Sequence, residues 1–226
     1  MNKILIISAH PDDDIIGCGG IISKYSKENI FRVIFIAEGS SCRYTDIDNE
    51  VVINEINNRN ECGLNALKLL GVRDVKFYNL KCGRLDQVPI ININKIIENE
   101  VIEFSPNIVF THSDKDANND HLIVHKSTLM ATRPGSSCFV SKLYSYEVLS
   151  SSEWRFTKTF KPNFFESISK NDLQKKWNAL KEYKSEIKPF PYPRSFEGLE
   201  SLARYRGMQS NNEYAEAFEL IREINQ

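Results

Sequence analysis

The chain has 226 residues and a formal net charge of −1, from 29 Lys and Arg against 30 Asp and Glu. Its length suits one domain, residues 1–226, with a substantial core, and its balanced charge without a basic block argues against nucleic acid or an anionic membrane surface as a partner. The longest apolar runs, "ILIIS" and "VIFIA", are of strand length and fall far short of the roughly 20 residues that span a bilayer, so we expect a soluble protein without membrane insertion.

The first two thirds of the chain alternate short apolar runs with longer amphipathic runs, which is the pattern of β-α-β units. Strands are predicted over residues 3–9, 31–39, 75–80 and 107–112. Helices are predicted over residues 18–29, 49–71, 93–104 and 120–133, and a glycine or a proline ends the last three. We therefore expect an α/β protein with a Rossmann-like three-layer fold and a mainly parallel central sheet.

The last third is expected to be largely helical. Residues 139–150 alternate and are rich in aromatics, so they predict a further strand, for which we consider an antiparallel direction. Helices are predicted over residues 171–187, with Asn171 as N-cap, and over residues 212–224. Residues 188–200 between them hold three prolines and predict a loop.

The five cysteines, at positions 18, 42, 62, 82 and 138, are odd in number and form no CxxC pair. This usage is typical of reduced thiols in a cytoplasm rather than of a disulfide framework or a cysteine-ligated metal. The N-terminal apolar run is too short for a signal peptide and acids follow it at once. We expect a cytoplasmic protein.

The segment "SAHPDDDIIGCGG" places His10 and three consecutive aspartates, Asp12 to Asp14, at the end of the first predicted strand. Ligands of an open parallel α/β sheet bind at this edge. One carboxylate would suffice to cap the next helix, whereas three adjacent like charges need compensation by a cation. The glycines form no complete GxGxxG motif, and aspartates would repel a pyrophosphate. The segment therefore predicts a metal site.

A second polar cluster follows the strand predicted at 107–112. The segment "THSDKDANNDHLIVH" contains His112, His121 and His125 and runs into a helix, so it lies at the same edge of the sheet as His10. Two histidines and one carboxylate leave a coordination position open for water, which is typical of a catalytic zinc site. The two clusters together predict such a site.

These motifs resemble those of the PIG-L (LmbE-like) family of zinc-dependent N-acetylglucosamine deacetylases. The sequence "HPDD" stands at residues 10–13 and an Asp-His pair opens a later helix, while "GRLDQVPI", "KPN" and "RGMQSNNEYAEAF" extend the likeness over most of the chain. The resemblance implies one zinc ion per chain, with His10, Asp13 and His121 as its ligands. It also implies that Asp12 is the general base. The whole chain would then be a single deacetylase domain.

Three residues beside these positions need separate interpretation. Asp14 and Asp120 are expected to steady the ligand residues by hydrogen bonding. Asn118 stands where well-studied family members carry a histidine that stabilises the oxyanion, and an amide donates a hydrogen bond but does not act as an acid. Either Asp12 returns the proton to the leaving amine, or His112 or His125 acts in its place. Of these two histidines we favour His112.

The resemblance also points to residues that bind substrate. Arg59, Arg84 and Asp116 match positions near the family's pocket, and Arg194 lies in a C-terminal loop of the kind that forms its upper wall. Arg194 and Arg206 would suit an anionic aglycone, such as malate or a nucleotide diphosphate.

The resemblance implies an amidohydrolase acting on linear amides, which removes the N-acetyl group of a 2-acetamido sugar or of its glycoside or nucleotide conjugate. The N-acetylglucosaminyl-malate deacetylase of bacillithiol synthesis is a narrower alternative. Two alternatives from other classes are a magnesium-dependent phosphate-ester hydrolase and an aspartyl phosphotransferase, which also use clustered aspartates after a first strand. The metal sites of these enzymes would not need His10 and His121. A non-catalytic sugar-binding module is a further alternative. The amide of Asn118 in place of a histidine favours it, whereas the intact base Asp12 argues against it. The expected partner is a small amino sugar, and a homotrimer or homohexamer would be compatible with an exposed aromatic strand at 139–148.

Overall fold

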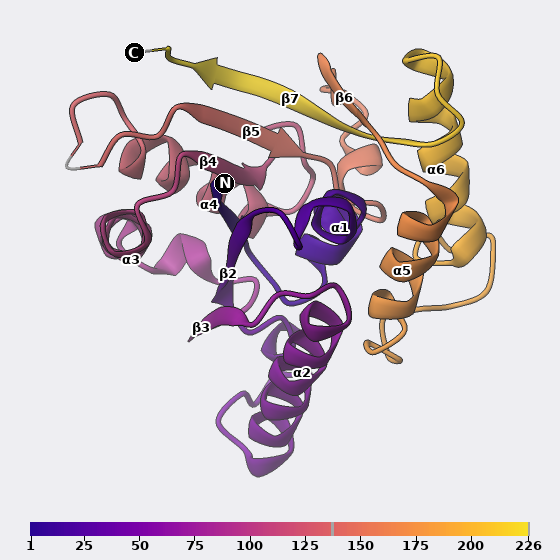
Figure 1. The fold of residues 1–226 in the computed structure, drawn as a ribbon. Coiled ribbons are helices and arrows are strands. Elements are labelled where there is room, and N and C mark those ends of the chain that lie inside the picture. The colour runs from indigo at the N-terminus through magenta and orange to yellow at the C-terminus, as the bar shows by residue number, and fades with distance from the viewer. Residues whose placement is uncertain (137, 226) are drawn as a thin grey trace.

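A twisted sheet runs through the molecule, with the strand order β3-β2-β1-β4-β5-β7-β6 (Figure 1). The computed structural model describes residues 1–136 and 138–225. Strands β1 to β5 are parallel to one another, whereas β7 runs antiparallel to both β5 and β6. The strands are β1 (Lys3–Ser8), β2 (Ile30–Ala37), β3 (Asp74–Leu80), β4 (Ile108–His112), β5 (Lys142–Tyr146), β6 (Phe164–Ser167) and β7 (Ala215–Glu223).

Helices cover both faces of the sheet. On one face α3 packs against α4, and on the other α5 packs against α1, α2 and α6 (Figure 1). The α-helices are α1 (Asp13–Tyr25), α2 (Glu50–Leu69), α3 (Ile90–Phe104), α4 (Asn119–Ala131), α5 (Lys170–Leu180) and α6 (Phe196–Gln209). Short 3-10 helices lie at η1 (Ser41–Arg43), η2 (Leu85–Gln87) and η3 (Ser152–Trp154).

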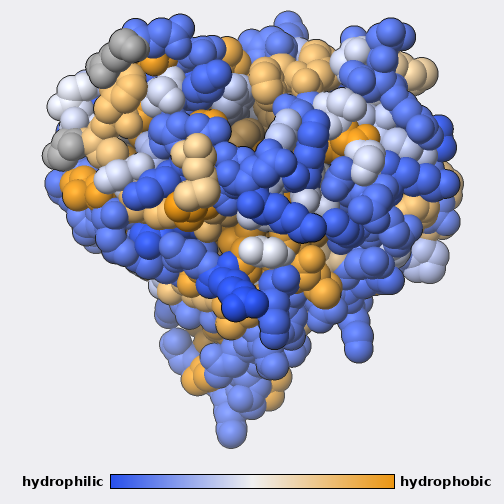
Figure 2. Space-filling model, viewed as in Figure 1, coloured by the Kyte–Doolittle hydropathy of each residue, from blue (hydrophilic) through white to orange (hydrophobic). Residues whose placement is uncertain are grey.

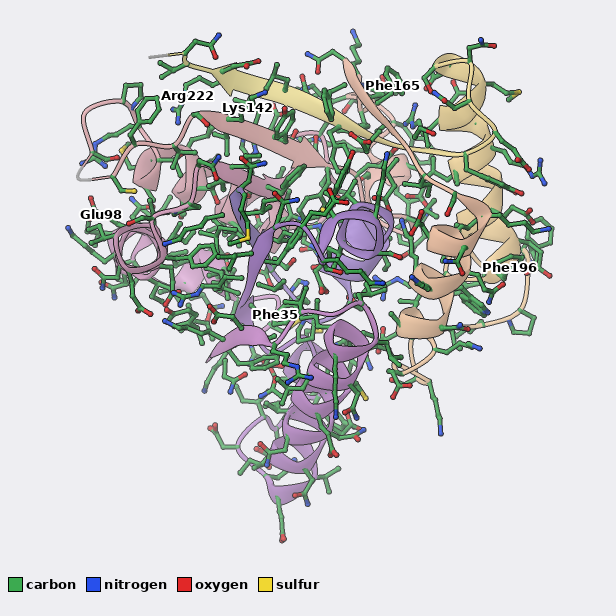
Figure 3. All side chains as sticks on the ribbon, viewed as in Figure 1. Phe35, Glu98, Lys142, Phe165, Phe196 and Arg222 are labelled. Carbon is green, nitrogen blue, oxygen red and sulfur yellow. The ribbon has the colours of Figure 1, made fainter. Side chains whose placement is uncertain are left out.

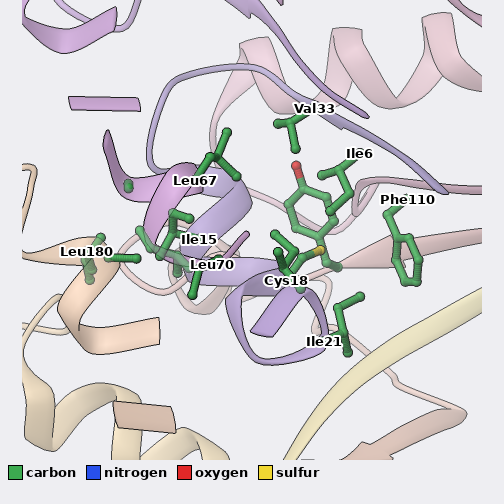
Figure 4. Packing of buried hydrophobic residues seen from close by; sticks show 14 of the residues in the cluster. Ile6, Ile15, Cys18, Ile21, Val33, Leu67, Leu70, Phe110 and Leu180 are labelled. Carbon is green, nitrogen blue, oxygen red and sulfur yellow. The ribbon is translucent and has the colours of Figure 1, made fainter. Parts of the chain in front are cut away.

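Two apolar cores lie against the two faces of the sheet because successive strand residues point to opposite sides. In β1, Ile4 and Ile6 belong to one core, while Leu5 and Ile7 belong to the other. Figure 4 shows the first core, in which Ile6 lies near residues of α1 and α2. Both faces of β1 are buried, as is typical of a parallel strand covered by helices on each side.

The second strand and its helix show how these layers join. Phe35 of β2 stacks on the ring of Phe77 from β3, with ring centroids 5.0 Å apart. Figure 3 labels Phe35 near α2, and it shares the first core with Ala66 and Leu67 of that helix. The aromatic pair therefore links the edge of the sheet to α2.

Polar side chains begin several of the helices. Asn49 accepts a hydrogen bond from the backbone N–H of Val52 at the start of α2, and Ser169 forms a capping box with Asp172 at the start of α5. Such caps satisfy N–H groups that have no partner within the helix.

One face of the molecule is mostly polar (Figure 2). The face in Figure 2 is largely blue, with apolar residues scattered among the polar ones. Within residues 1–136 and 138–225, no helix combines the length and the apolar character needed to cross a membrane.

The structure confirms the α/β fold and its mainly parallel sheet. The four strands and four helices predicted in the first two thirds are all present, although α1 begins at Asp13 rather than at residue 18. The glycines at 17, 19 and 20 weaken the helical signal there. The strand predicted at 139–150 is β5, and it runs parallel to β4, not antiparallel. Its Tyr144 and Tyr146 are buried, whereas Phe139, which precedes β5, is exposed.

The C-terminal predictions were less accurate. Residues 215–223 form strand β7 instead of a helix, because pairing with both β5 and β6 outweighs the helix propensity of this segment. Strand β6 was not predicted. Helix α5 is capped by Ser169 rather than by Asn171 and ends at Leu180, and α6 begins at Phe196, inside the predicted loop.

The strand order places a switch point at β1. The chain passes from β1 to β2 and β3 on one side and returns through α3 to β4 on the other side. The helices that follow β1 and β4 therefore diverge at adjacent strand ends, where open α/β sheets bind their ligands.

Gly17 allows close packing of α1 on the sheet. A Cβ atom at this position would lie 2.3 Å from Cδ2 of the fully buried Tyr146. We expect Gly17→Ala to destabilise the fold by about 1–3 kcal/mol, measured by urea unfolding. Gly63→Ala in α2 is the matched control, because its nearest contacts would be 3.3 Å. Equal free energies of unfolding for the two variants would contradict this account of Gly17.

Candidate metal centre

His10, Asp13 and His121 meet at the adjacent ends of β1 and β4. We call these three residues the metal group. One ligand atom from each residue lies within 4.8 Å of the others, and all three residues are buried. His10 comes from the loop after β1, Asp13 begins α1, and His121 lies in the first turn of α4. The two clusters predicted at one edge of the sheet do converge.

Asp13 lies at the centre of this group. Its Oδ2 atom is 3.3 Å from Nδ1 of His10 and 3.2 Å from Nε2 of His121. The backbone N–H of His10 also donates to Oδ2, at 2.9 Å. Burial alone would raise the pKa of Asp13, but the nearby imidazoles of His121 and His10 hold it well below the usual value. Asp13 is therefore an anion.

The unpaired atoms of the group fit a divalent cation. Oδ1 of Asp13 is buried and has no hydrogen-bond partner among the described residues, and Nε2 of His121, although 3.2 Å from Oδ2 of Asp13, forms no hydrogen bond with it. Leaving a buried polar atom unpaired costs about 1–3 kcal/mol, and a cation between them would remove that cost. Imidazole nitrogen and carboxylate oxygen are ligands of zinc. The donor set thus fits a zinc-like ion.

Each histidine is oriented by a second carboxylate. Nε2 of His10 lies 3.0 Å from Oδ2 of Asp120, and Nδ1 of His121 lies 3.2 Å from Oδ2 of Asp116. The other two ring nitrogens, Nδ1 of His10 and Nε2 of His121, face Asp13. They are the nitrogens left to bind a metal if each ring carries its proton on the side of Asp120 or Asp116. Carboxylates paired with ligand histidines in this way fix the tautomer and the ring orientation.

These carboxylates also affect the charge of the imidazoles in the metal-free protein. Burial lowers the pKa of His10, but hydrogen bonds to Asp120 and Asp13 outweigh it and raise the pKa to about 9. For His121, burial is outweighed by Asp13 and Asp116, and the pKa rises to about 10. Metal binding must therefore displace protons from the site.

Asp120 and Asp116 are themselves held by hydrogen bonds. Asp120 accepts from the backbone N–H groups of Gly83, at 2.6 Å, and Leu85, at 3.2 Å. Asp116 accepts from the hydroxyls of Ser151 and Ser152. It is fully buried behind His121, so it is not at the pocket surface where substrate contact was predicted.

Asp12 lies beside the metal group in an unusual backbone conformation, with φ of 122°. Its Oδ2 atom accepts from Nη1 of Arg194 at 2.6 Å and from Nη2 of Arg59 at 3.0 Å. Its Oδ1 atom is buried and has no partner among the described residues. Burial raises the pKa of Asp12, although both guanidinium groups oppose the shift. Asp12 therefore offers one unpaired oxygen next to the metal group.

A buried glutamate holds the arginines in place. Glu186 accepts from Arg59 at 2.5 Å, from Arg43 at 2.6 Å and from Arg194 at 3.1 Å. Burial would raise the pKa of Glu186, but the arginines, Arg59 foremost, lower it to about 2. Sequence reasoning missed Glu186, since a charged residue after a helix gives no local signal of such a role.

Asp14 contacts the backbone of Asp12. It is fully buried, and its Oδ1 atom accepts from the backbone N–H of Asp12 at 3.3 Å. Burial, followed by the charge of Asp12, raises the pKa of Asp14 to about 8. Asp14 thus supports the loop that carries Asp12 rather than a ligand side chain.

The other two histidines lie behind the site. His112 is fully buried, its Nε2 atom accepts from the backbone N–H of Ala9 at 2.8 Å, and its ring stacks on His121. His125 contacts the carbonyl oxygen of His112 through Nδ1. Neither histidine lines the pocket, so the position of His112 does not support the acid role predicted for it.

A pocket of about 330 Å³ opens above the metal group. Its lining includes Asn118, whose Oδ1 caps α4 by accepting from the backbone N–H of Asp120. The Nδ2 group of Asn118 has no hydrogen-bond partner among the described residues. Arg59 and Arg194 line the pocket and Arg84 does not. The remaining lining is His10, Asp12, Asp13, Gly39, Cys42, Arg43, Cys82, Ala117, His121, Ser150, Ser151, Trp154 and Glu186.

A larger cavity, of about 610 Å³, lies elsewhere and contains none of the metal group. Arg206 lines it and donates to both carboxylate oxygens of Glu147, at 2.7 Å. Arg206 is therefore not in the pocket where an anionic aglycone was expected to meet it.

Comparison with known proteins gives one family and several structural neighbours. The sequence model described as "PIG-L: GlcNAc-PI de-N-acetylase" matches residues 5–132. A protein of Escherichia coli (strain K12) described as "Uncharacterized deacetylase YaiS" is 30% identical over 189 residues, which cover 80% of this chain and 90% of that protein.

Two solved structures share the fold at lower identity. N,N'-diacetylchitobiose deacetylase from Pyrococcus horikoshii has a TM-score of 0.76 and 21% identity, covering 97% of this chain and 84% of that chain. GalB, the 4-carboxy-2-hydroxymuconate hydratase from Pseudomonas putida KT2440, has a TM-score of 0.77 and 20% identity, covering 100% and 98%. At such identities the likeness establishes the fold and leaves the reaction open.

The pairing of Asp120 with His10 can be tested by metal binding. We expect Asp120→Asn to lower the affinity for zinc about 10–100-fold, measured by competition with a chromophoric chelator. Asp114→Asn is the matched control, because Asp114 lies in the loop just before α4 but is half-exposed and pairs with Lys115. An affinity of Asp120→Asn equal to that of the control would show that this carboxylate does not support the ligand.

Proposed function

The chain belongs to the PIG-L family, and from this premise we propose that it is a zinc-dependent hydrolase that removes the N-acetyl group from a 2-acetamido sugar or from a glycoside or nucleotide conjugate of one. The observation that carries the proposal is the convergence of two imidazoles and a carboxylate, with unpaired buried atoms, beside the free oxygen of Asp12.

In this proposal His10, Asp13 and His121 hold the metal. The atoms concerned are Nδ1 of His10, the carboxylate of Asp13 and Nε2 of His121. When bound, the ion would supply Lewis acidity, polarising the acetamide carbonyl and lowering the pKa of a water molecule. The carboxylates behind the two histidines would keep both rings directed at it.

Asp12 is the proposed general base. Its Oδ1 atom takes a proton from the attacking water, whose oxygen forms the new bond to the carbonyl carbon. When the C–N bond then breaks, the leaving nitrogen needs a proton, and Oδ1 can return the one it holds. Arg59 and Arg194 donate hydrogen bonds to Oδ2, which leaves Oδ1 as the oxygen that exchanges the proton.

Asn118 is the proposed oxyanion donor. Its Oδ1 is engaged in capping α4, so Nδ2 is the part that can donate to the negative oxygen that develops on the carbonyl. Donors aimed at that position act only as the charge forms. Since an amide does not release a proton, the proton of the leaving amine is assigned to Asp12.

The pocket wall suits a polar, ring-shaped substrate. Arg59 directs Nη1 and Nη2 to Glu186 and Asp12, so we assign it to positioning Asp12 rather than to the sugar. Trp154, which is about half-exposed, lines the same pocket, and its ring offers an apolar surface to the C–H face of a sugar. Arg194 remains a candidate for contact with substrate.

The reaction can be tested directly on zinc-loaded protein. We expect release of a primary amine from N-acetylglucosamine, from its malate glycoside or from its nucleotide sugar. We expect Asp12→Asn to lower kcat about 10²–10⁴-fold while zinc content stays unchanged, and His121→Ala to lose zinc as well as activity. If none of the three compounds releases an amine, or if a phosphate ester is hydrolysed instead, the proposal fails.

The role of Asn118 can be separated from its role as a helix cap. Asn118→Asp keeps the oxygen that caps α4 but removes the N–H donor. We expect kcat to fall about 10²–10³-fold, as for the loss of one oxyanion donor, with little change in the thermal unfolding midpoint. A kcat equal to that of the wild type would contradict the assignment.

A further inference from the structure

Two cysteines at the rim of the pocket lie in contact. Sγ of Cys82, in the loop after β3, is 3.2 Å from Sγ of Cys42, in η1. Both residues line the pocket above the metal group. A disulfide has an S–S distance of about 2.0 Å, so a movement on the order of 1 Å would join them.

The contact is fixed by the backbone around the two cysteines. One buried carboxylate, Glu38, accepts from the backbone N–H of Cys82 at 2.8 Å and from those of Ser40, at 2.6 Å, and Ser41, at 2.9 Å. Ser41 directly precedes Cys42. Glu38 therefore binds the backbone of both cysteine-bearing segments at once, which keeps Cys42 and Cys82 side by side.

The two cysteines differ in solvent exposure. Cys42 is exposed, whereas Cys82 is only 5% exposed. An exposed cysteine beside a buried partner is the arrangement of a thiol that reacts first and a second that resolves the product.

We propose that Cys42 and Cys82 form a redox-active pair, which a small disulfide oxidises to an intramolecular disulfide at the rim of the site. The Cys42 thiolate attacks one sulfur of the oxidant, forming a mixed disulfide and releasing one thiolate. The Cys82 thiolate then attacks the Cys42 sulfur, forming the protein disulfide and releasing the second. The protein loses two electrons and two protons, and the oxidant leaves as two thiols.

Oxidation would also act on the metal group. Gly83 follows Cys82, and its backbone N–H donates to Oδ2 of Asp120, the same atom that pairs with Nε2 of His10. Drawing Cys82 toward Cys42 moves the residue that holds Asp120. This part of the inference rests on the proposed metal centre, and it predicts weaker zinc binding by the oxidised protein, about 10-fold or more.

The disulfide is tested on the full chain without any substrate. We expect glutathione disulfide to remove the mass of two hydrogen atoms from the native protein, and peptide mapping to find Cys42 joined to Cys82. Dithiothreitol should reverse the change. Cys138→Ser, at a half-buried site away from the pocket, should behave as the wild type, whereas Cys42→Ser and Cys82→Ser should not form the cross-link.

A stable glutathione adduct on Cys42 without a cross-link, or a cross-link through another cysteine, would overturn the proposal. The zinc affinity of reduced, oxidised and Cys42→Ser protein, measured by chelator competition, tests the coupling. We expect only oxidised wild-type protein to bind more weakly, and an unchanged affinity would overturn the coupling. Because neither readout uses a substrate, both are independent of failure of the deacetylase proposal.

Discussion

Three adjacent carboxylates are buried at the end of β1, and much of the site is arranged around their charge. Each is compensated differently. Asp13 faces two imidazoles and the proposed position of a cation, Asp12 accepts from Arg59 and Arg194, and burial raises the pKa of Asp14 to about 8, which favours its neutral form. A buried like-charge run without such partners would be strongly destabilising. The partners come from α2, α4 and the loop before α6, so the site connects elements distant in sequence.

Residues from two regions of the chain form the site. The metal group lies within residues 5–132, the region that the family model matches. Glu186 and Arg194 lie beyond it and reach back to Asp12 and Arg59. The last third thus sets the surroundings of the proposed base and part of the pocket wall. The convergence of His10, Asp13 and His121 depends on the strand order, whereas the pocket wall also depends on segments after residue 132.

The convergence of His10, Asp13 and His121 was predictable from sequence, and so was the support of His10 by Asp120, but the other contacts around them were not. His10, Asp13 and His121 follow predicted strands, and the carboxyl ends of parallel strands share one edge. Glu186 and the contact of Cys42 with Cys82 depend on loops whose positions no periodic pattern reveals. Asp116 was expected at the pocket because it matches a family position there, yet it is buried and pairs with His121 and Ser152. Strand β7 was mistaken for a helix because its partners, β5 and β6, decide its conformation.

The fold alone does not decide the reaction, since similar TM-scores relate this chain to a deacetylase and to a hydratase. The polar groups around the proposed metal position must therefore determine which reaction takes place. With an amide at Asn118, the only proton that the proposed mechanism handles is the one on Asp12, so one carboxylate must accept it and then release it. Burial favours the protonated form of Asp12, and the two arginines favour the ionised form. These two influences act in opposite directions on the one group that the proposed mechanism uses first as base and then as acid.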